Sequence, residues 1–285
     1  MDLCDIRVIR ALLARHGAHF SKSKGQNFLC EARVPAEIAA LCGANESFGV
    51  LEVGPGIGCL TAELCAAAGK VLAVEVDESL RPILAETMAD KDNLELRFGD
   101  ILKQDIPALI GEAFPGLRRM ACANLPYYIT TPVLTALLES KCFEAVTVMV
   151  QKEVAERICA RPGTSEYGAF TVFCRYYADA AIVLQVPSGC FIPQPKVDSA
   201  VVRLAVRGAP PCPIRDEALF FKTVRASFAH RRKTLRNGLS AGFPQLSREE
   251  LSAILAECGL PENVRGETLD LPAFASLAEA IAGRL

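Results

Sequence analysis

Short apolar runs alternate with longer segments of helical periodicity from residue 50 onward, and few folds accommodate such a pattern. The apolar runs that we interpret as strands span residues 50–53, 71–76, 94–98, 119–123 and 145–150. The segments between them are long enough for a helix that crosses from one strand to the next, which is how parallel strands are joined. The pattern therefore predicts an α/β fold with a doubly wound, mainly parallel sheet.

Two further apolar runs end this region and differ from the others in their connection. They span residues 180–187 and 199–206, and a short loop with two prolines joins them. A helix cannot cross over in so short a connection, so we expect an antiparallel pair that closes the sheet.

A segment rich in proline separates the α/β region from the C-terminal part of the chain. Residues 208–213 hold one glycine and three prolines, which indicates a linker. Beyond it, the periodicity of three segments predicts helices. We therefore expect an α/β domain with an N-terminal closing segment over residues 1–207, and a small helical domain over residues 214–285.

The composition excludes several classes of protein. With 51% hydrophobic and 22% charged residues, the chain can bury a core and is not disordered. Its twelve cysteines include no C-x-x-C pair, which favours reduced thiols over a disulfide framework or a zinc site. No apolar run is long enough to span a bilayer, and the first twenty residues lack the features of a signal peptide. We expect a cytoplasmic protein with no metal and no membrane partner.

Three glycines follow the first predicted strand, where the chain turns into a helix. Gly54, Gly56 and Gly58 allow a tight turn and let a ligand approach the backbone. Glu75 ends the second strand about twenty residues later, where a carboxylate can accept the hydrogens of a ribose. Taken alone, Glu75 is equally well explained as a surface acid at the end of a strand.

Asp100 follows the third predicted strand and adds a second acid at the same edge of the sheet. A carboxylate there could accept an amino hydrogen of adenine, although the residue also suits a helix N-cap. Because open α/β sheets bind ligands at the carboxyl ends of their strands, the three features together predict a nucleotide site. A hydride-transferring enzyme would share them, but the loop lacks the full G-x-G-x-x-G spacing. S-adenosylmethionine accounts for the loop and for the motif after the fourth strand.

That motif, "NLPY" at residues 124–127, suits the amino group of a base. The exocyclic amine of adenine is a poor nucleophile because its lone pair is delocalised into the ring. Carbonyl oxygens of the Asn124 side chain and of the Leu125 backbone, presented by the bend before Pro126, could hold its N–H groups and favour a pyramidal nitrogen. Tyr127 can stack on the base. The alternative is a loop with a core tyrosine, and the glycine loop favours the binding site.

The chain carries five segments that together resemble one family. They are "GQNFL" (25–29), "EVGPGIG" (52–58), "NLPYYITTP" (124–132), "FIPQPKVDSAVV" (191–202) and "HRRKTLRN" (230–237). In this order they resemble the KsgA (RsmA) family, whose members are S-adenosylmethionine-dependent dimethyltransferases with a Rossmann-like class I methyltransferase sheet. The resemblance implies dimethylation of the N6 of two adjacent adenosines near the 3′ end of small-subunit (16S) rRNA, together with a role in ribosome assembly.

The resemblance also implies roles for individual residues. Those expected to bind the cofactor are Gln26, Asn27, Leu29, Gly54, Gly56, Glu75, Asp100, Ile101 and Asn124. Those expected to face the target base are Asn124, Leu125, Pro126, Tyr127 and, as a second aromatic wall, Phe191. His230 stands where the family is expected to have glutamine, which concerns only a local RNA contact.

A basic run in the helical part predicts contact with RNA. The residues are Lys222, Arg225, Arg231, Arg232, Lys233 and Arg236, with no acid among residues 222–237. Since the formal net charge of the chain is −2, affinity for RNA must come from such a local patch. A solvated helix face is the alternative. We expect a monomer that acts on the small ribosomal subunit; the alternatives are a large-subunit rRNA methyltransferase and a non-catalytic ribosome-assembly or RNA-binding factor.

Overall fold

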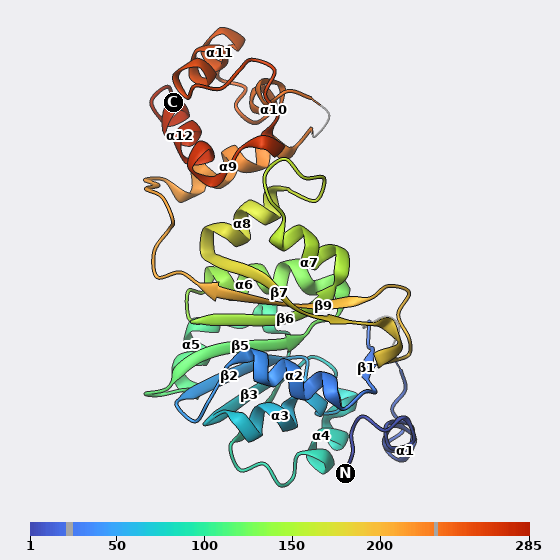
Figure 1. Ribbon diagram of the computed structural model, residues 1–285. Helices are drawn as coiled ribbons and strands as arrows, with labels where there is room; N and C mark the ends of the chain where they lie inside the picture. Colours follow the sequence, from blue (N-terminus) through green and yellow to red (C-terminus); the bar gives the residue numbers. More distant parts are fainter. Residues whose placement is uncertain (21–24, 231–232) are drawn as a thin grey trace. The chain divides into compact units, whose positions relative to one another are not determined.

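The computed structural model describes residues 1–20, 25–230 and 233–285, and it divides the chain into two compact units (Figure 1). The first unit comprises residues 1–155 and 180–206, and the second comprises residues 156–179 and 207–285. The first holds the predicted sheet, and the second is helical.

The sheet of the first unit has seven strands in the order β4-β3-β2-β5-β6-β9-β7. Their bounds are β2 Phe48–Val53, β3 Lys70–Glu75, β4 Leu94–Phe98, β5 Arg118–Asn124, β6 Ala145–Gln151, β7 Ala178–Val186 and β9 Ser199–Val206. The pairs among β2 to β6 are parallel, and β9 runs antiparallel to β6. Because strand order reverses at β2, which lies between β3 and β5, the carboxyl ends of β2 and β5 flank a crevice of the kind that binds ligands.

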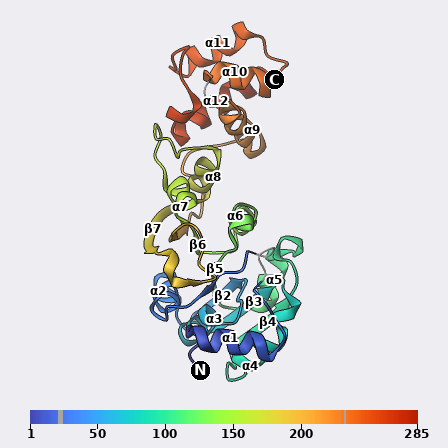
Figure 2. The ribbon, with the colours of Figure 1, turned by 90° about the vertical axis from the view of Figure 1, so that its right-hand side faces the viewer.

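Helices cover both faces of this sheet. Figures 1 and 2 show α2 and α3 on one face and α5 and α6 on the other. The bounds are α2 Arg33–Cys42, α3 Cys59–Ala67, α4 Arg81–Thr87, α5 Ile106–Ala113 and α6 Thr130–Glu139. Apolar side chains of α2 and α3 pack on those of the sheet, and the buried cysteines Cys42, Cys65 and Cys122 belong to this core. These thiols are therefore packing residues, as the sequence predicts.

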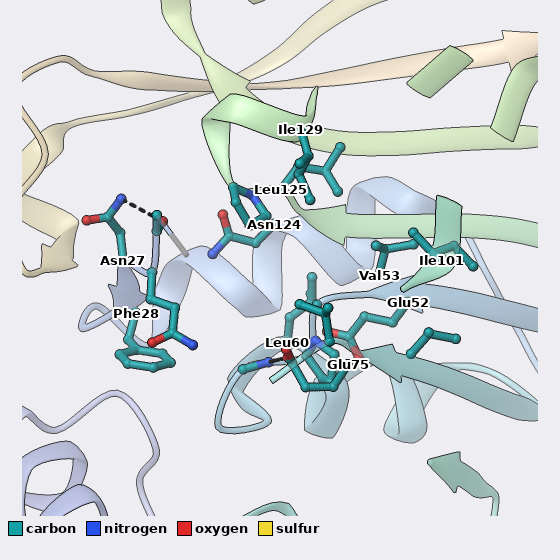
Figure 3. Close-up of a pocket in the computed structure, with 18 of the residues that line it drawn as sticks. Asn27, Phe28, Glu52, Val53, Leu60, Glu75, Ile101, Asn124, Leu125 and Ile129 are labelled. Atoms are coloured by element: carbon teal, nitrogen blue, oxygen red, sulfur yellow. Dashed lines mark hydrogen bonds between the residues drawn. The ribbon is translucent and has the colours of Figure 1, made fainter. Parts of the chain in front are cut away.

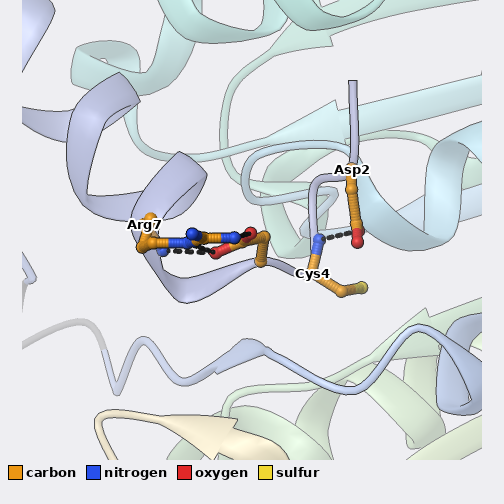
Figure 4. A network of polar contacts seen from close by, with 4 residues as sticks. Asp2, Cys4 and Arg7 are labelled. Carbon is orange, nitrogen blue, oxygen red and sulfur yellow. Dashed lines mark hydrogen bonds and ion pairs between the residues drawn. The ribbon is translucent and has the colours of Figure 1, made fainter.

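The N-terminal segment begins with α1, Ile6–Arg15. Asp5 caps this helix by accepting the Arg7 backbone N–H, and it also pairs with the Arg7 guanidinium, which lowers the pKa of Asp5 to about 2. Figure 4 shows this contact beside the Cys4 N–H, which donates to Asp2 over 2.9 Å. After α1 the chain reaches β1, Phe28–Leu29, which pairs antiparallel with β8, Phe191–Ile192. This pairing brings the N-terminal segment against the loop that precedes β9.

The second unit differs from the helical domain expected from the sequence, because it also includes residues 156–179. Its helices are α8 Ala169–Tyr177, α9 Glu217–Phe228, α10 Leu235–Gly242, α11 Arg248–Glu257 and α12 Leu271–Ala282, and α7 Lys152–Cys159 spans the boundary. Aromatic packing explains the difference: the Tyr176 ring lies 5.5 Å from Phe220 and 5.1 Å from Phe221. Both Tyr176 and Tyr177 donate their hydroxyls to Glu217, which ties α8 to α9.

Over the residues that the structure describes, no helix combines the length and apolar character needed to cross a membrane.

Candidate active site

A cavity of about 250 Å³ opens at the carboxyl ends of β2, β3 and β5 (Figure 3). Every residue that the sequence assigned to the cofactor or to the target base lines it: Gln26, Asn27, Leu29, Gly54, Gly56, Glu75, Asp100, Ile101, Asn124, Leu125, Pro126, Tyr127 and Phe191. Residues as far apart in the chain as Gln26 and Phe191 thus line the same cavity.

The glycine loop follows β2 and has a backbone that only glycine adopts readily. Gly54, Gly56 and Gly58 have φ angles of 72°, 62° and 98°. A Cβ at Gly56 would lie 3.2 Å from the ring of Phe28, and one at Gly58 would lie 2.7 Å from Met88 Cε. The absence of side chains therefore lets the loop approach its neighbours closely and leaves the start of α3 accessible from the cavity.

Glu75 ends β3 and holds the glycine loop in place. Its Oε2 accepts the Gly56 N–H over 3.1 Å, and its Oε1 accepts the Asp77 N–H over 2.8 Å. The residue is only 5% exposed, and this burial raises the pKa of its carboxyl group. Asp77 in turn accepts the Gln26 side-chain amide over 2.7 Å, which links the N-terminal segment to the end of β3.

Asp100 is a helix N-cap that also lines the cavity. Its Oδ1 accepts the Leu102 N–H over 3.0 Å and caps the short helix Ile101–Lys103, yet the residue also lines the cavity. A capping bond engages one carboxylate oxygen, so the two roles are compatible.

Asn124 is the last residue of β5, where it pairs with Met149 of β6. The Leu125 N–H donates to the Met149 carbonyl over 3.3 Å, and the Pro126 carbonyl accepts the Ile129 N–H over 3.1 Å. Among the residues that the structure describes, neither the Asn124 side chain nor the Leu125 carbonyl has a hydrogen-bond partner. The backbone fixes both groups at the cavity and leaves their oxygens able to accept (Figure 3).

Two aromatic residues, Tyr127 and Phe191, line the cavity together with Asn124. The Tyr127 hydroxyl lies 2.9 Å from Ser199 Oγ, and burial raises the pKa of this half-buried phenol. Phe191 is 4% exposed, and its strand β8 is held by the pairing of Phe191 with Leu29. Both rings are therefore anchored by contacts distant in sequence.

Several further residues line the cavity although the sequence assigned them no individual role: Phe28, Glu52, Val53, Val76, Leu102, Tyr128 and Ile129. Val76 and Leu102 each directly follow a predicted site residue in the sequence, and they are 53% and 41% exposed. An aliphatic residue directly after a predicted site residue, as Val76 follows Glu75 and Leu102 follows Ile101, is the signal in the sequence that could have identified these two.

Glu52 is a buried acid beneath the glycine loop. It is 1% exposed, and burial raises the pKa of its carboxyl group to about 8. In the part of the chain that the structure covers, neither its Oε2 nor the Oγ1 of Thr61 has a hydrogen-bond partner. The acid is therefore neutral at neutral pH, because an unpaired buried charge would be costly.

Replacement of Glu52 by Gln is expected to flatten the dependence of stability on pH. Glutamic acid has a reference pKa of 4.5, whereas the pKa of folded Glu52 is about 8. Between these values the folded chain keeps a proton that the unfolded chain has lost, so the free energy of unfolding falls as pH rises. Over two pH units the loss amounts to about 2–3 kcal/mol. Urea unfolding at pH 5.5 and 7.5 measures it, and equal losses in the wild type and the variant would contradict the assignment.

The predicted RNA-binding residues lie in the second unit. Lys222, Arg225 and Lys233 are exposed, and Lys222 Nζ lies 4.5 Å from the centre of the Phe243 ring. Arg236 is instead engaged within the unit: its Nη1 lies 2.7 Å from Glu262 and 3.0 Å from Ser252. Arg231 and Arg232 are outside the described residues. Residues 222–237 contain no acid, but Arg236 thus pairs with Glu262, which lies outside this run.

The model of the family described as ribosomal RNA adenine dimethylase matches residues 17–278. The chain belongs to this family. A ribosomal RNA small subunit methyltransferase A from Geobacillus thermodenitrificans (strain NG80-2) is 46% identical over 276 residues, which cover 95% of this chain and 94% of the relative. The protein of the same name from Streptococcus gordonii is 45% identical, with 99% and 98% covered.

Two solved structures share the fold of this chain. A dimethyladenosine transferase from Plasmodium falciparum has a TM-score of 0.77 at 24% identity, with 90% of this chain and 98% of that chain covered. The 23S rRNA methyltransferase ErmE has a TM-score of 0.67 at 26% identity, with 90% and 100% covered. The predicted family, the class I methyltransferase fold and the enzyme class, an S-adenosylmethionine-dependent rRNA adenine dimethyltransferase, are confirmed.

Proposed function

We propose that this chain transfers methyl groups from S-adenosylmethionine to the N6 of two adjacent adenosines near the 3′ end of small-subunit rRNA. The observation that carries the proposal is one cavity that joins the Glu75-bound glycine loop to the two free oxygens of Asn124 and Leu125. The relatives named ribosomal RNA small subunit methyltransferase A support the choice of subunit. The product is N6,N6-dimethyladenosine.

The residues at the ends of β2, β3 and β4 fit the parts of S-adenosylmethionine, whose sulfonium supplies the methyl group. Gly54 and Gly56 present backbone without side chains to the methionine part. Glu75 lies buried where it can accept the ribose hydroxyls, and Asp100 with Ile101 can receive the adenine. Gln26, Asn27 and Leu29 would close the site from the N-terminal segment, which the bond from Gln26 to Asp77 holds at the end of β3.

The residues after β5 would orient the target amine. Asn124 Oδ1 and the Leu125 carbonyl accept one N–H each, which draws the nitrogen lone pair out of conjugation and toward the methyl donor. Pro126 sets the bend that presents the Leu125 carbonyl, and Tyr127 and Phe191 hold the ring of the base by stacking. Positioning of the reacting atoms then supplies much of the rate.

Action as a monomer on the small ribosomal subunit is part of this proposal. A ribosomal-subunit substrate would place the reaction in the cytoplasm. Within the described residues there is no group of three or more His, Cys, Asp or Glu side chains that could hold a metal ion.

The experiment that tests the proposal uses labelled S-adenosylmethionine and small ribosomal subunits that lack the modification. Mass spectrometry of nuclease fragments should find dimethyladenosine at two adjacent positions near the 3′ end of the rRNA. Transfer to large-subunit rRNA instead would contradict the choice of subunit. Binding to subunits without transfer would favour a non-catalytic assembly factor.

Replacement of Lys222, Arg225 and Lys233 by Ala should weaken binding to small subunits and reduce its dependence on salt. Each phosphate contact contributes about 0.7–0.9 to the slope of log K against log salt concentration, because binding releases counterions. Filter binding over a range of salt concentrations measures the slope. The control removes three exposed arginines of the same unit, Arg215, Arg248 and Arg265. If both triple variants behaved alike, the basic run would be a solvated face.

A further inference from the structure

The two consecutive tyrosines after Pro126 have different surroundings. Tyr127 is half-buried and bound to Ser199, whereas Tyr128 is 60% exposed. Both line the cavity. An exposed aromatic ring at the mouth of a base-binding cavity can bind a ligand favourably, because a ligand that covers the ring removes its apolar surface from water. Tyr128 therefore offers a free aromatic surface where the target base would enter.

Gly25 supports one side of the Tyr128 ring. A Cβ at Gly25 would lie 3.2 Å from Tyr128 Cδ1 and 3.3 Å from Cε1, and it would lie 3.5 Å from Pro126 Cβ. Gly25 has a φ of 61°, and its carbonyl accepts the Asn27 side-chain amide over 3.3 Å (Figure 3). The ring thus rests on backbone that is itself held in position, and its exposed part faces solvent.

We propose that Tyr128 binds the base of the nucleotide adjacent to the target adenosine by stacking on it. The proposal rests on the function proposed above and names a second base site for that substrate. When one of two adjacent adenosines occupies the cavity between Asn124 and Phe191, its neighbour is one backbone linkage away and must lie at the mouth. Stacking on an aromatic ring accepts any base, so the same site serves whichever adenosine is outside.

The first test compares Tyr128→Ala with Tyr128→Phe on unmodified small subunits under single-turnover conditions. Loss of the ring should slow dimethylation at least about fivefold, the lower end of what stacking contributes per base. The phenylalanine variant keeps the ring and should act like the wild type. S-adenosylmethionine affinity, measured by calorimetry, should be the same for all three proteins, which also shows that the alanine variant is folded.

The second test removes the partner of the ring. Subunits are reconstituted with rRNA in which one of the two adenosines is replaced by an abasic nucleotide, and methylation of the other is measured. On the abasic subunits the wild type should methylate the remaining adenosine more slowly, by about the factor by which Tyr128→Ala slows the reaction on intact subunits. The alanine variant should methylate abasic and intact subunits at the same rate. The proposal would be overturned if the abasic nucleotide and Tyr128→Ala each reduced the rate by its own factor and the two factors multiplied. It would also be overturned if the alanine variant were as fast as the wild type on intact subunits. A wild type that methylates neither adenosine of the intact subunits would contradict the proposed function instead.

Discussion

Replacement of Asn124 by Ala is expected to slow methyl transfer by about 100-fold or more, the effect of removing one group that stabilises a transition state. The Asn124 oxygen lies at the end of β5 with its position fixed by pairing to Met149, and it is free to accept an N–H of the target amine. Its contribution is made as the nitrogen becomes pyramidal, so the chemical step suffers more than ground-state binding. Affinities for S-adenosylmethionine and for subunits should remain close to those of the wild type.

The matched variant for this prediction is Asn124→Asp, which keeps an acceptor oxygen at the same place and should retain more activity than the alanine variant. Dimethylation adds a finer readout, because the nitrogen keeps a single hydrogen after the first transfer and can then engage only one acceptor. Single-turnover assays with product analysis separate the two transfers. An Asn124→Ala enzyme that makes dimethyladenosine at the wild-type rate would contradict the proposed mechanism.

Replacement of Glu75 by Ala is expected to weaken S-adenosylmethionine binding by about 1–3 kcal/mol, the effect of removing a charged hydrogen-bond acceptor. The structure adds a reason beyond the ribose contact: the Glu75 carboxylate also holds the N–H groups of Gly56 and Asp77. The alanine variant should therefore lose the ribose acceptor and loosen the glycine loop together. Calorimetry of the purified variant measures the change.

Two further variants separate these effects. Glu78, an exposed neighbour on the same turn, is the control, and its replacement by Ala should leave affinity unchanged. Glu75→Gln keeps one acceptor oxygen and should fall between the wild type and the alanine variant. Burial raises the pKa of Glu75, so the affinity of the wild type for S-adenosylmethionine should fall as lower pH protonates this carboxyl group, while the affinity of the glutamine variant should not change with pH. Unchanged affinity of a folded Glu75→Ala protein would exclude the ribose role.

The sequence determined the features that depend on neighbours along the chain. Alternation of apolar runs and helical segments requires parallel strands with crossover helices, and the structure has them from β2 to β6. Positive φ angles at Gly54, Gly56 and Gly58 follow from turn chemistry within a few residues. Because parallel strands share one edge at their carboxyl ends, Glu75 and Asn124 had to meet there once the sheet formed.

The tertiary structure decided the contacts between segments far apart in sequence. Pairing of Phe28 with Ile192 brings Asn27 to the cavity, and the Tyr127 hydroxyl finds Ser199 across 72 positions. Aromatic packing on α9 draws α8, which precedes the proline-rich segment in the chain, into the second unit. The fold also brings Glu262 to Arg236, and burial, together with the nearby charge of Glu75, raises the pKa of Glu52 to about 8. Packing selects such partners by shape and free energy over the whole core, which no local pattern of residues specifies.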